Sequence, residues 1–188
     1  MPGRVIVAIT GASGAIYGIR ALEILHGLNI ETHLILSTTA KVTIQHETQL
    51  LVSDVEALAG IVYDHLDLTA PISSGSYPVQ GMIIAPCSIK TLSAVANSYA
   101  ADLIARAVDV CLKEGRPLVL MVRETPLHRG HLDLMVKATE MGAIIFPPVP
   151  AFYGHPNTID DLVNASVGRA LARLGIDNQA YPRWKDLD

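Results

Sequence analysis

The stretch Arg4-Val5-Ile6-Val7-Ala8-Ile9-Thr10-Gly11-Ala12-Ser13-Gly14 decides the fold of this chain. It begins with an apolar run that is too short for a buried helix and ends in a turn with two glycines, after which apolar residues recur at helical spacing. A buried strand that turns tightly into a helix is the opening unit of a parallel α/β sheet. Such a turn directs backbone N–H groups and the positive end of the helix dipole toward one point, which favours a phosphate.

The same alternation of short apolar runs and helical segments continues along the chain. Buried strands are expected at Arg4–Ile9, Thr32–Leu36, Gly81–Ala85, Leu118–Val122 and Ala143–Phe146. Helices are expected over Ala15–Leu28, Lys41–Leu50, Ser88–Ala96, Ala101–Glu114, His128–Met141 and Thr158–Leu174. A long exposed loop, Thr69–Pro78, is expected before the third strand. The pattern predicts a single α/β domain with a Rossmann-like or flavodoxin-like doubly wound parallel sheet.

Composition excludes several classes of protein. With 188 residues, half of them hydrophobic, the chain can bury a core without disulfides or metal. Its 14 basic and 18 acidic residues form no basic stripe, so no nucleic-acid partner is expected. Cys87 and Cys111 cannot form a disulfide framework, which favours a reduced, cytoplasmic protein. No stretch approaches the roughly 20 apolar residues of a membrane span, so no membrane partner is expected.

Residues 176–188 show only weak helical periodicity, unlike the segments before them. We expect one domain over residues 1–175, followed by a tail over residues 176–188. This tail contains Trp184, the only tryptophan of the chain. Because an exposed tryptophan on a tail is unusual, we expect Trp184 to dock on its own domain or on a neighbouring subunit.

Ser13 and Ser37 narrow the class of ligand. The Ser13 hydroxyl can add a hydrogen bond to a bound phosphate, or it can simply cap the helix that follows. The turn lacks the full dinucleotide fingerprint, and Ser37 follows the second strand where an acidic residue would hold a ribose. A mononucleotide is therefore a better candidate than NAD.

Two further junctions fall at the carboxyl edge of the expected sheet. Ser88 and Thr91 follow a strand and can cap the next helix or hold the other side of a ligand. Arg123 ends the strand 118–122 and would point into the same crevice, where its guanidinium can bind phosphate bidentately. Glu124, next to it, can orient the arginine or transfer a proton.

Other polar residues allow two interpretations. Arg106 and Lys113 share one helix face, but Asp102 and Asp109 stand four residues before them, which favours ordinary surface ion pairs. The segment Pro147–Tyr153 is either a rigid apolar wall with a tyrosine hydroxyl or a structural crossover. The remaining candidates, His128 and His131, lack a third ligand at metal spacing and are expected to lie on a helix surface. No metal site is predicted.

Motifs along nearly the whole chain match one family. They are Thr10–Ala15, Glu47-Thr48, Ser73–Ser76, Pro86–Leu92, Arg106 with Ala107 and Asp109, Leu112–Glu114, Arg123–Leu127, His131-Leu132, Pro150–Tyr153 and Arg183-Trp184. With these motifs the chain resembles the UbiX/Pad-type flavin prenyltransferases, and its Ser-Ser-Gly-Ser-Tyr-Pro loop resembles the members associated with aromatic-acid decarboxylases. Ile89 stands where close relatives often have Met, a substitution that conserves volume.

The resemblance implies an activity and a set of ligands. It implies a dodecamer that joins a dimethylallyl group from dimethylallyl phosphate to reduced FMN, giving prenylated FMN for a UbiD-type decarboxylase. The FMN-binding residues that it implies are Gly11, Ala12, Ser13, Ser37, Ser88, Ile89, Lys90, Thr91 and Arg123. The residues that it implies for dimethylallyl phosphate are Arg106, Lys113, Arg123, Glu124, Tyr153 and Arg169.

The resemblance also implies catalytic roles. Ser13 and Glu47 would assist proton movement at the flavin, Lys113 and Glu124 would act at the phosphate, and Trp184 would close the site. An allylic phosphate can ionise to a carbocation and phosphate, so cationic side chains can replace a metal ion. The flavin and the tryptophan would shield the carbocation from water and steady it. Ring closure then needs a base, either the released phosphate or Glu124.

Two other functions stay open on the residues alone. FMN-dependent cysteine decarboxylases share this fold and carry a catalytic histidine after an early helix, and His46 adjoins Glu47. Their Asn-rich substrate motif is absent here, and the Arg123–Pro126 motif argues against them. A non-catalytic flavin-binding subunit is the second alternative, but such a protein has no need for a second phosphate cradle.

Overall fold

One parallel sheet organises the computed structural model, which describes residues 3–183. The strands are β1 (Arg4–Ile9), β2 (Glu31–Leu36), β3 (Ile61–Tyr63), β4 (Gly81–Cys87), β5 (Leu118–Val122) and β6 (Ile144–Ile145). Their order across the sheet is β3-β2-β1-β4-β5-β6, and every pair is parallel. The order reverses between β1 and β4, and the crevice at such a switch point is where doubly wound sheets bind ligands.

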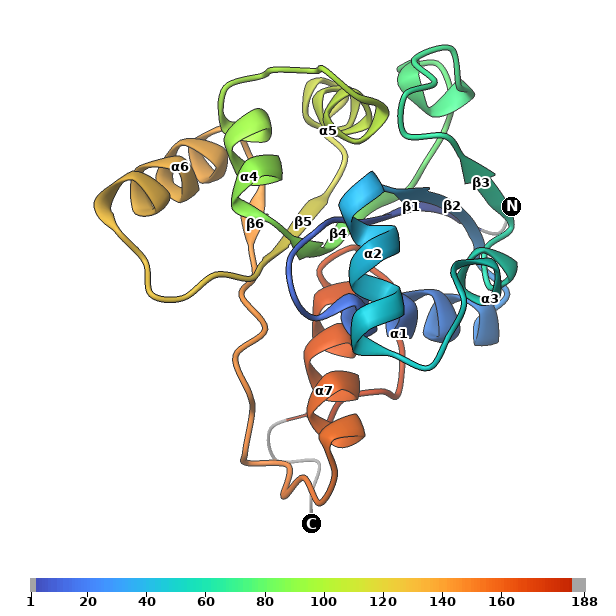
Figure 1. Ribbon diagram of the computed structural model, residues 1–188, viewed down its shortest axis with the longest axis vertical. Helices are drawn as coiled ribbons and strands as arrows, with labels where there is room; N and C mark the ends of the chain where they lie inside the picture. Colours follow the sequence, from blue (N-terminus) through green and yellow to red (C-terminus); the bar gives the residue numbers. More distant parts are fainter. Residues whose placement is uncertain (1–2, 184–188) are drawn as a thin grey trace.

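Helices cover both faces of this sheet (Figure 1). They are α1 (Ala15–Gly27), α2 (Thr38–Glu47), α3 (Val52–Ala57), α4 (Ile89–Ala96), α5 (Leu103–Lys113), α6 (Arg129–Glu140) and α7 (Ile159–Ala172), with a short 3-10 helix η1 (Pro71–Ser73). Buried residues of α1, α2, α3 and α7 share one hydrophobic cluster, and those of α4, α5, α6 and η1 share the other. No helix among residues 3–183 is long and apolar enough to cross a membrane.

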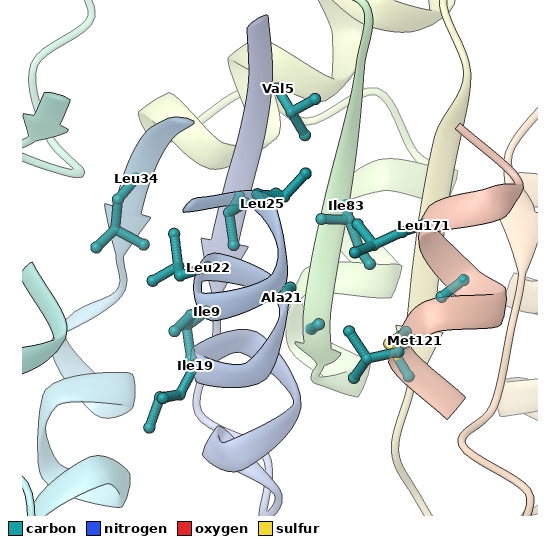
Figure 2. Packing of buried hydrophobic residues seen from close by; sticks show 14 of the residues in the cluster. Val5, Ile9, Ile19, Ala21, Leu22, Leu25, Leu34, Ile83, Met121 and Leu171 are labelled. Carbon is teal, nitrogen blue, oxygen red and sulfur yellow. The ribbon is translucent and has the colours of Figure 1, made fainter. Parts of the chain in front are cut away.

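The alternation of side chains along β1 explains the two clusters. Val5, Val7 and Ile9 enter the cluster beneath α1 and α7, whereas Ile6 and Ala8 enter the cluster on the opposite face. All five side chains are almost fully buried, as expected for a central strand of a parallel sheet. Figure 2 shows the first of these clusters, in which α1 and α7 cover the central strands. The sheet therefore holds the ends of β1 and β4 rigidly beside each other.

The predicted doubly wound fold is confirmed, with two elements missed. The strand at Ile61–Tyr63 and the helix at Val52–Ala57 were not predicted. Both elements are short, and Ile61 and Val62 are largely exposed on an edge strand, so their apolar pattern is weak. The Thr69–Pro78 segment therefore precedes the fourth strand, and it is not wholly exposed because η1 buries Ile72.

The chain after α7 folds back onto that helix. Asn178 is buried, and its amide donates hydrogen bonds to the carbonyl oxygens of Gly168 and Ile176. Tyr153 donates a hydrogen bond from its hydroxyl to the carbonyl oxygen of Pro182. The tail up to residue 183 thus contacts both α7 and the segment that carries Tyr153. Trp184, for which we predicted a docking role, lies outside the described residues.

Candidate active site

The turn after β1 is held by Glu47, the last residue of α2. The Glu47 carboxylate accepts hydrogen bonds from the backbone N–H groups of Gly14 (2.8 Å) and Ala15 (3.1 Å). Gly14, and not Ser13, is the N-cap of α1. Its φ of 102° is a left-handed conformation that favours glycine. Ser13 as N-cap is therefore wrong. Two N–H groups that we expected to be free for a phosphate are occupied by this carboxylate.

Four side chains form one electrostatic cluster around the turn. Partial burial opposes ionisation of Glu47, but hydrogen bonds from the Ser13 hydroxyl and the two N–H groups, with the charge of Arg123, hold its pKa below the ordinary value. Burial raises the pKa of Tyr17, and the positive charge of Arg123 counteracts part of this rise. Glu47 is thus a carboxylate, and Tyr17 a neutral phenol, beside a cation.

Two serines cap helices at the same edge of the sheet. The Ser37 hydroxyl oxygen accepts a hydrogen bond from the N–H of Ala40 at the start of α2 (3.1 Å). At the start of α4, the Ser88 oxygen accepts a hydrogen bond from the N–H of Thr91 (3.3 Å). Capping leaves other N–H groups of each first turn without a helical partner. Two positive helix ends therefore converge beside the end of β1, an arrangement that binds phosphate well.

Thr10 fixes the distance between the two central strand ends. Its side chain is 1% exposed, donates a hydrogen bond to the carbonyl oxygen of Pro86 (2.7 Å) and accepts one from the N–H of Ser88 (2.9 Å). This bridge links the end of β1 to the start of the α4 turn. Sequence reasoning did not single out Thr10, because its partners lie far along the chain.

A cavity of about 700 Å³ opens beside these helix ends. It lies between the start of α2, one face of α4 and the start of α5, and His65 lies across from α4. A His65 ring nitrogen lies 3.2 Å from the Thr38 hydroxyl at its wall. Of the residues expected to bind FMN, Ser37 and Lys90 line this cavity.

Arg123 and Glu124 follow β5 at this edge. The Arg123 N–H donates a hydrogen bond to the carbonyl oxygen of Cys87, which fixes the backbone next to β4 (3.1 Å). Both side chains are exposed, and Glu124 accepts a hydrogen bond from the N–H of Thr125. Within residues 3–183 the Arg123 guanidinium makes no ion pair, so its fork can bind an anionic ligand.

Tyr153 and Arg169 line a second, smaller cavity of about 260 Å³. Its other walls come from the end of β6, the proline-rich segment after it, and α7. Because β6 pairs with β5 in parallel, the end of β6 lies at the same sheet edge as Arg123. The structure therefore brings Tyr153 and Arg169 to one cavity, and their part in binding dimethylallyl phosphate, which the family resemblance implied, stays a prediction.

Lys113 lies away from Arg123, and neither Lys113 nor Arg106 makes the ion pair expected for it. Lys113 ends α5, just before β5 begins, whereas Arg123 follows the end of that strand. A strand of five residues separates the two by roughly 15 Å. The expected i,i+4 ion pairs are also wrong: Arg106 pairs with Asp109 (2.8 Å), and Lys113 pairs with its neighbour Glu114 (2.8 Å). A single chain does not bring Lys113 to Arg123.

The cysteines and histidines show no sign of catalytic chemistry. Burial raises the pKa of Cys87 to about 12 and that of Cys111 to about 11, so both are protonated thiols. His128 caps α6, and its ring lies 3.6 Å from the ring of His131, centroid to centroid. In the part of the chain that the structure describes, no three His, Cys, Asp or Glu side chains are grouped to hold a metal ion.

Comparison with known proteins identifies the family. The flavoprotein family model matches residues 2–171. The flavin prenyltransferase UbiX of Thauera aromatica is 56% identical over 181 residues, which cover 96% of this chain and 93% of the relative. The chain belongs to the flavoprotein family and, within it, to the UbiX flavin prenyltransferases. The family predicted from the motifs is therefore confirmed.

Solved structures of this prenyltransferase family share the whole architecture. A crystal structure of AnUbiX (PadA1) in complex with FMN and dimethylallyl pyrophosphate is 48% identical, with a TM-score of 0.97 and coverage of 100% of both chains. A dodecameric FMN-dependent UbiX-like decarboxylase from Escherichia coli O157:H7 is 46% identical, with a TM-score of 0.94, covering 97% of this chain and 99% of that one. The FMN-dependent cysteine decarboxylase SpaF is 15% identical at a TM-score of 0.63 and shares the fold alone.

Proposed function

We propose that this chain joins a dimethylallyl group from dimethylallyl phosphate to reduced FMN and releases prenylated FMN and phosphate. One observation carries this proposal: the Ser13–Glu47 pair lies at a sheet edge that also holds two separate anion-binding regions. The first comprises the helix ends capped by Ser37 and Ser88. The second comprises Arg123 and the cavity with Tyr153 and Arg169. A transferase that joins two phosphorylated substrates needs both regions.

FMN fits the first region. We assign its phosphate to the helix ends of α2 and α4, which Ser37 and the segment Ser88-Ile89-Lys90-Thr91 supply. The flavin ring would lie over Gly11 and Ala12 toward Ser13 and Arg123. A side chain at Gly11 would collide with Thr39, so glycine here lets the turn after β1 pack closely against the start of α2. Glu47 and Ser13 form a hydrogen-bonded pair that can move a proton at the ring edge.

Dimethylallyl phosphate fits the second region. Its C–O bond breaks to leave phosphate, and the guanidinium groups of Arg123 and Arg169 stabilise that leaving group. The Tyr153 hydroxyl joins them by exchanging its hydrogen bond to the Pro182 carbonyl oxygen for one to the phosphate. The terminal allylic carbon bonds to the central-ring nitrogen of the flavin, whose proton passes to the released phosphate. Return of a proton to the remaining C=C bond leaves a tertiary carbocation, which bonds to the adjacent benzenoid carbon and closes a fourth ring. The proton lost from that carbon goes to the released phosphate or to Glu124. Trp184 is proposed to close the site.

Lys113 can join this cradle only from another copy of the chain. It ends α5 just before β5 begins, at the opposite end of that strand from Arg123, so its ammonium must come across a subunit interface. The dodecameric relative shows that this fold forms large assemblies. We therefore propose a homododecamer in which Lys113 of one copy completes the site of a neighbour. We further propose that the protein is cytoplasmic and supplies prenylated FMN to a UbiD-type decarboxylase.

Anaerobic incubation with reduced FMN and dimethylallyl phosphate tests this function. The flavin extracted afterwards is expected to be heavier by one C5H8 unit in the wild type. Replacing Arg123 or Lys113 by Ala should slow this conversion roughly 10²- to 10³-fold, because each removes a charge that stabilises the leaving phosphate. FMN should still bind to the Lys113→Ala variant.

Each rival function predicts a different result. A flavin of unchanged mass after incubation with the wild type would overturn the prenyltransferase proposal. Oxidative decarboxylation of a peptidyl cysteine would then favour a cysteine decarboxylase. Bound FMN with neither reaction would favour a non-catalytic flavin-binding subunit.

A further inference from the structure

The loop of residues 73–77 is held by arginine side chains from α5 and from the turn that follows it. The Arg116 guanidinium donates hydrogen bonds to the carbonyl oxygens of Gly75 (2.7 Å) and Tyr77 (2.9 Å). Arg106 donates one to the carbonyl oxygen of Ser73 (3.1 Å). The fork of Arg116 thus holds two carbonyl groups at once, which a lysine cannot do with the same geometry. The backbone of the 73–77 loop is fixed at both of its ends.

The far side of this loop is also anchored. The ring of Tyr77 lies under the Arg4 guanidinium, 5.1 Å from carbon to ring centroid, and meets the edge of the buried His33 ring at 5.5 Å between centroids. Cation–π and edge-to-face contacts of this kind stabilise aromatic positions. Tyr77 therefore gives the loop a fixed position relative to β2.

The middle of the loop lies directly over Lys113. A Cβ atom placed on Gly75 would stand 2.9 Å from the Lys113 Nζ and would collide with the Glu114 carboxylate. Only a glycine lets the backbone approach the Lys113–Glu114 ion pair this closely. The Lys113 side chain is 48% exposed, and a free lysine at such exposure would populate many rotamers. The loop above it and the ion pair with Glu114 restrict the Lys113 side chain to few rotamers.

We propose that Arg116 and Gly75 are positioning residues that hold the Lys113 ammonium in one orientation for the phosphate of dimethylallyl phosphate in a neighbouring copy. This inference rests on the function proposed above, in which Lys113 acts across an interface. Neither residue touches the substrate. Arg116 holds the backbone of the loop at a fixed distance from the end of α5. Gly75 has no side chain, so the Lys113 ammonium and the Glu114 carboxylate can form their ion pair beneath the loop.

A double-mutant cycle separates this role from mere stabilisation of the loop. Arg116→Gln should lower kcat/KM for dimethylallyl phosphate about tenfold in the wild type and less than about twofold when Lys113 is already Ala, because residues that act through one another are not additive. FMN affinity should stay unchanged. Arg173→Gln, at an exposed arginine after α7, is the matched control and should have no effect. Equal losses in both backgrounds, or no loss at all, would overturn the proposal.

Gly75→Ala tests the second residue. The added methyl group meets the flexible ends of Glu114 and Lys113 rather than backbone, so the variant should fold and displace the ammonium. Its kcat/KM should also fall about tenfold, again only when Lys113 is present. The control is Gly27→Ala, since a methyl group there has no neighbour within 4 Å. Wild-type kinetics in Gly75→Ala would contradict the role of this glycine.

Acylation of lysine amines, followed by peptide mass spectrometry, gives a readout without turnover. In Arg116→Gln and Gly75→Ala the acylation rate at Lys113 should rise severalfold relative to Lys41 and Lys137, which lie on other elements. An unchanged rate at Lys113 would overturn the positioning role. This measurement does not need catalysis, so it tests whether Arg116 and Gly75 restrain Lys113 even if the wild type leaves FMN unmodified. An unmodified FMN would contradict only the proposed function.

Discussion

Glu47 organises the turn after β1, and we propose that the same side chain takes part in the reaction. Its carboxylate takes the N–H groups of Gly14 and Ala15 and the hydroxyl of Ser13, so it replaces the phosphate that a glycine-containing turn often binds. In our proposal the FMN phosphate binds instead at the ends of α2 and α4. The carboxylate is thereby held ionised beside the proposed flavin ring, ready to accept a proton through Ser13.

Glu47→Gln should make stability depend less on pH. Because the pKa of Glu47 is lowered in the folded protein, its carboxylate stabilises the fold fully above the ordinary pKa of 4.5, and this stabilisation is lost as the pH falls through the lowered value. At pH 7 the variant should lose about 0.5 kcal/mol, the usual effect of a charge at a helix N-terminus. Thermal unfolding of both proteins between pH 3 and pH 7 measures this. A difference in melting temperature that persists or grows toward low pH would contradict it.

At this scale the sequence predicted isolated positions better than pairs. Ser37, Ser88 and Arg123 could be placed at one edge because each follows a recognisable strand, and the structure puts them there. The pairing of Glu47 with Gly14 spans 33 residues, and no local pattern reveals it. Only the family resemblance drew attention to Glu47. Tyr17 was not considered, because a tyrosine at an apolar position of a predicted helix is usually an ordinary core residue.

At the scale of elements, helix caps place the polar groups of the site. Ser37 and Ser88 cap α2 and α4, and Asp102 caps α5 through the N–H of Ala105 (2.9 Å). The sequence located these helices within a few residues, because apolar spacing is clear along α4 and α5, whereas α2 buries only Ala40 and Ile44 and was placed three residues too late. It assigned Asp102 to an ion pair with Arg106, since i,i+4 spacing does not distinguish a cap from a pair.

Substitutions at Asp102 separate those two roles. Asp102→Ala should lower the free energy of unfolding by about 1 kcal/mol, because the first turn of α5 loses its cap. Asp102→Asn should stay close to the wild type, because asparagine caps equally well without charge. Chemical denaturation at low and high salt measures both. If Asp102→Asn lowers stability as much as Asp102→Ala does, and high salt removes the difference between the wild type and both variants, an ion pair rather than a cap is the cause.

At the scale of the whole molecule, β5 separates two halves of the proposed site. The half with Ser13, Glu47, Arg123, Tyr153 and Arg169 lies at the carboxyl edge of the sheet, and the half with Lys113 lies near the start of β5. Sequence motifs contain the residues of both halves, but they do not show that the halves are far apart in the folded chain. Positions in a sequence do not give distances in space. Assembly of several copies is therefore part of the proposed mechanism rather than an accessory to it.

Mixing two inactive variants tests this account most directly. Chains with Lys113→Ala keep Arg123, and chains with Arg123→Ala keep Lys113, so neither assembly alone should convert reduced FMN to the heavier flavin. Assemblies formed from an equal mixture of both chains should recover about one quarter of the wild-type rate, because one site in four then pairs an intact Arg123 with a neighbour's intact Lys113. Mixed assemblies that stay as inactive as their parents would contradict a site shared between copies.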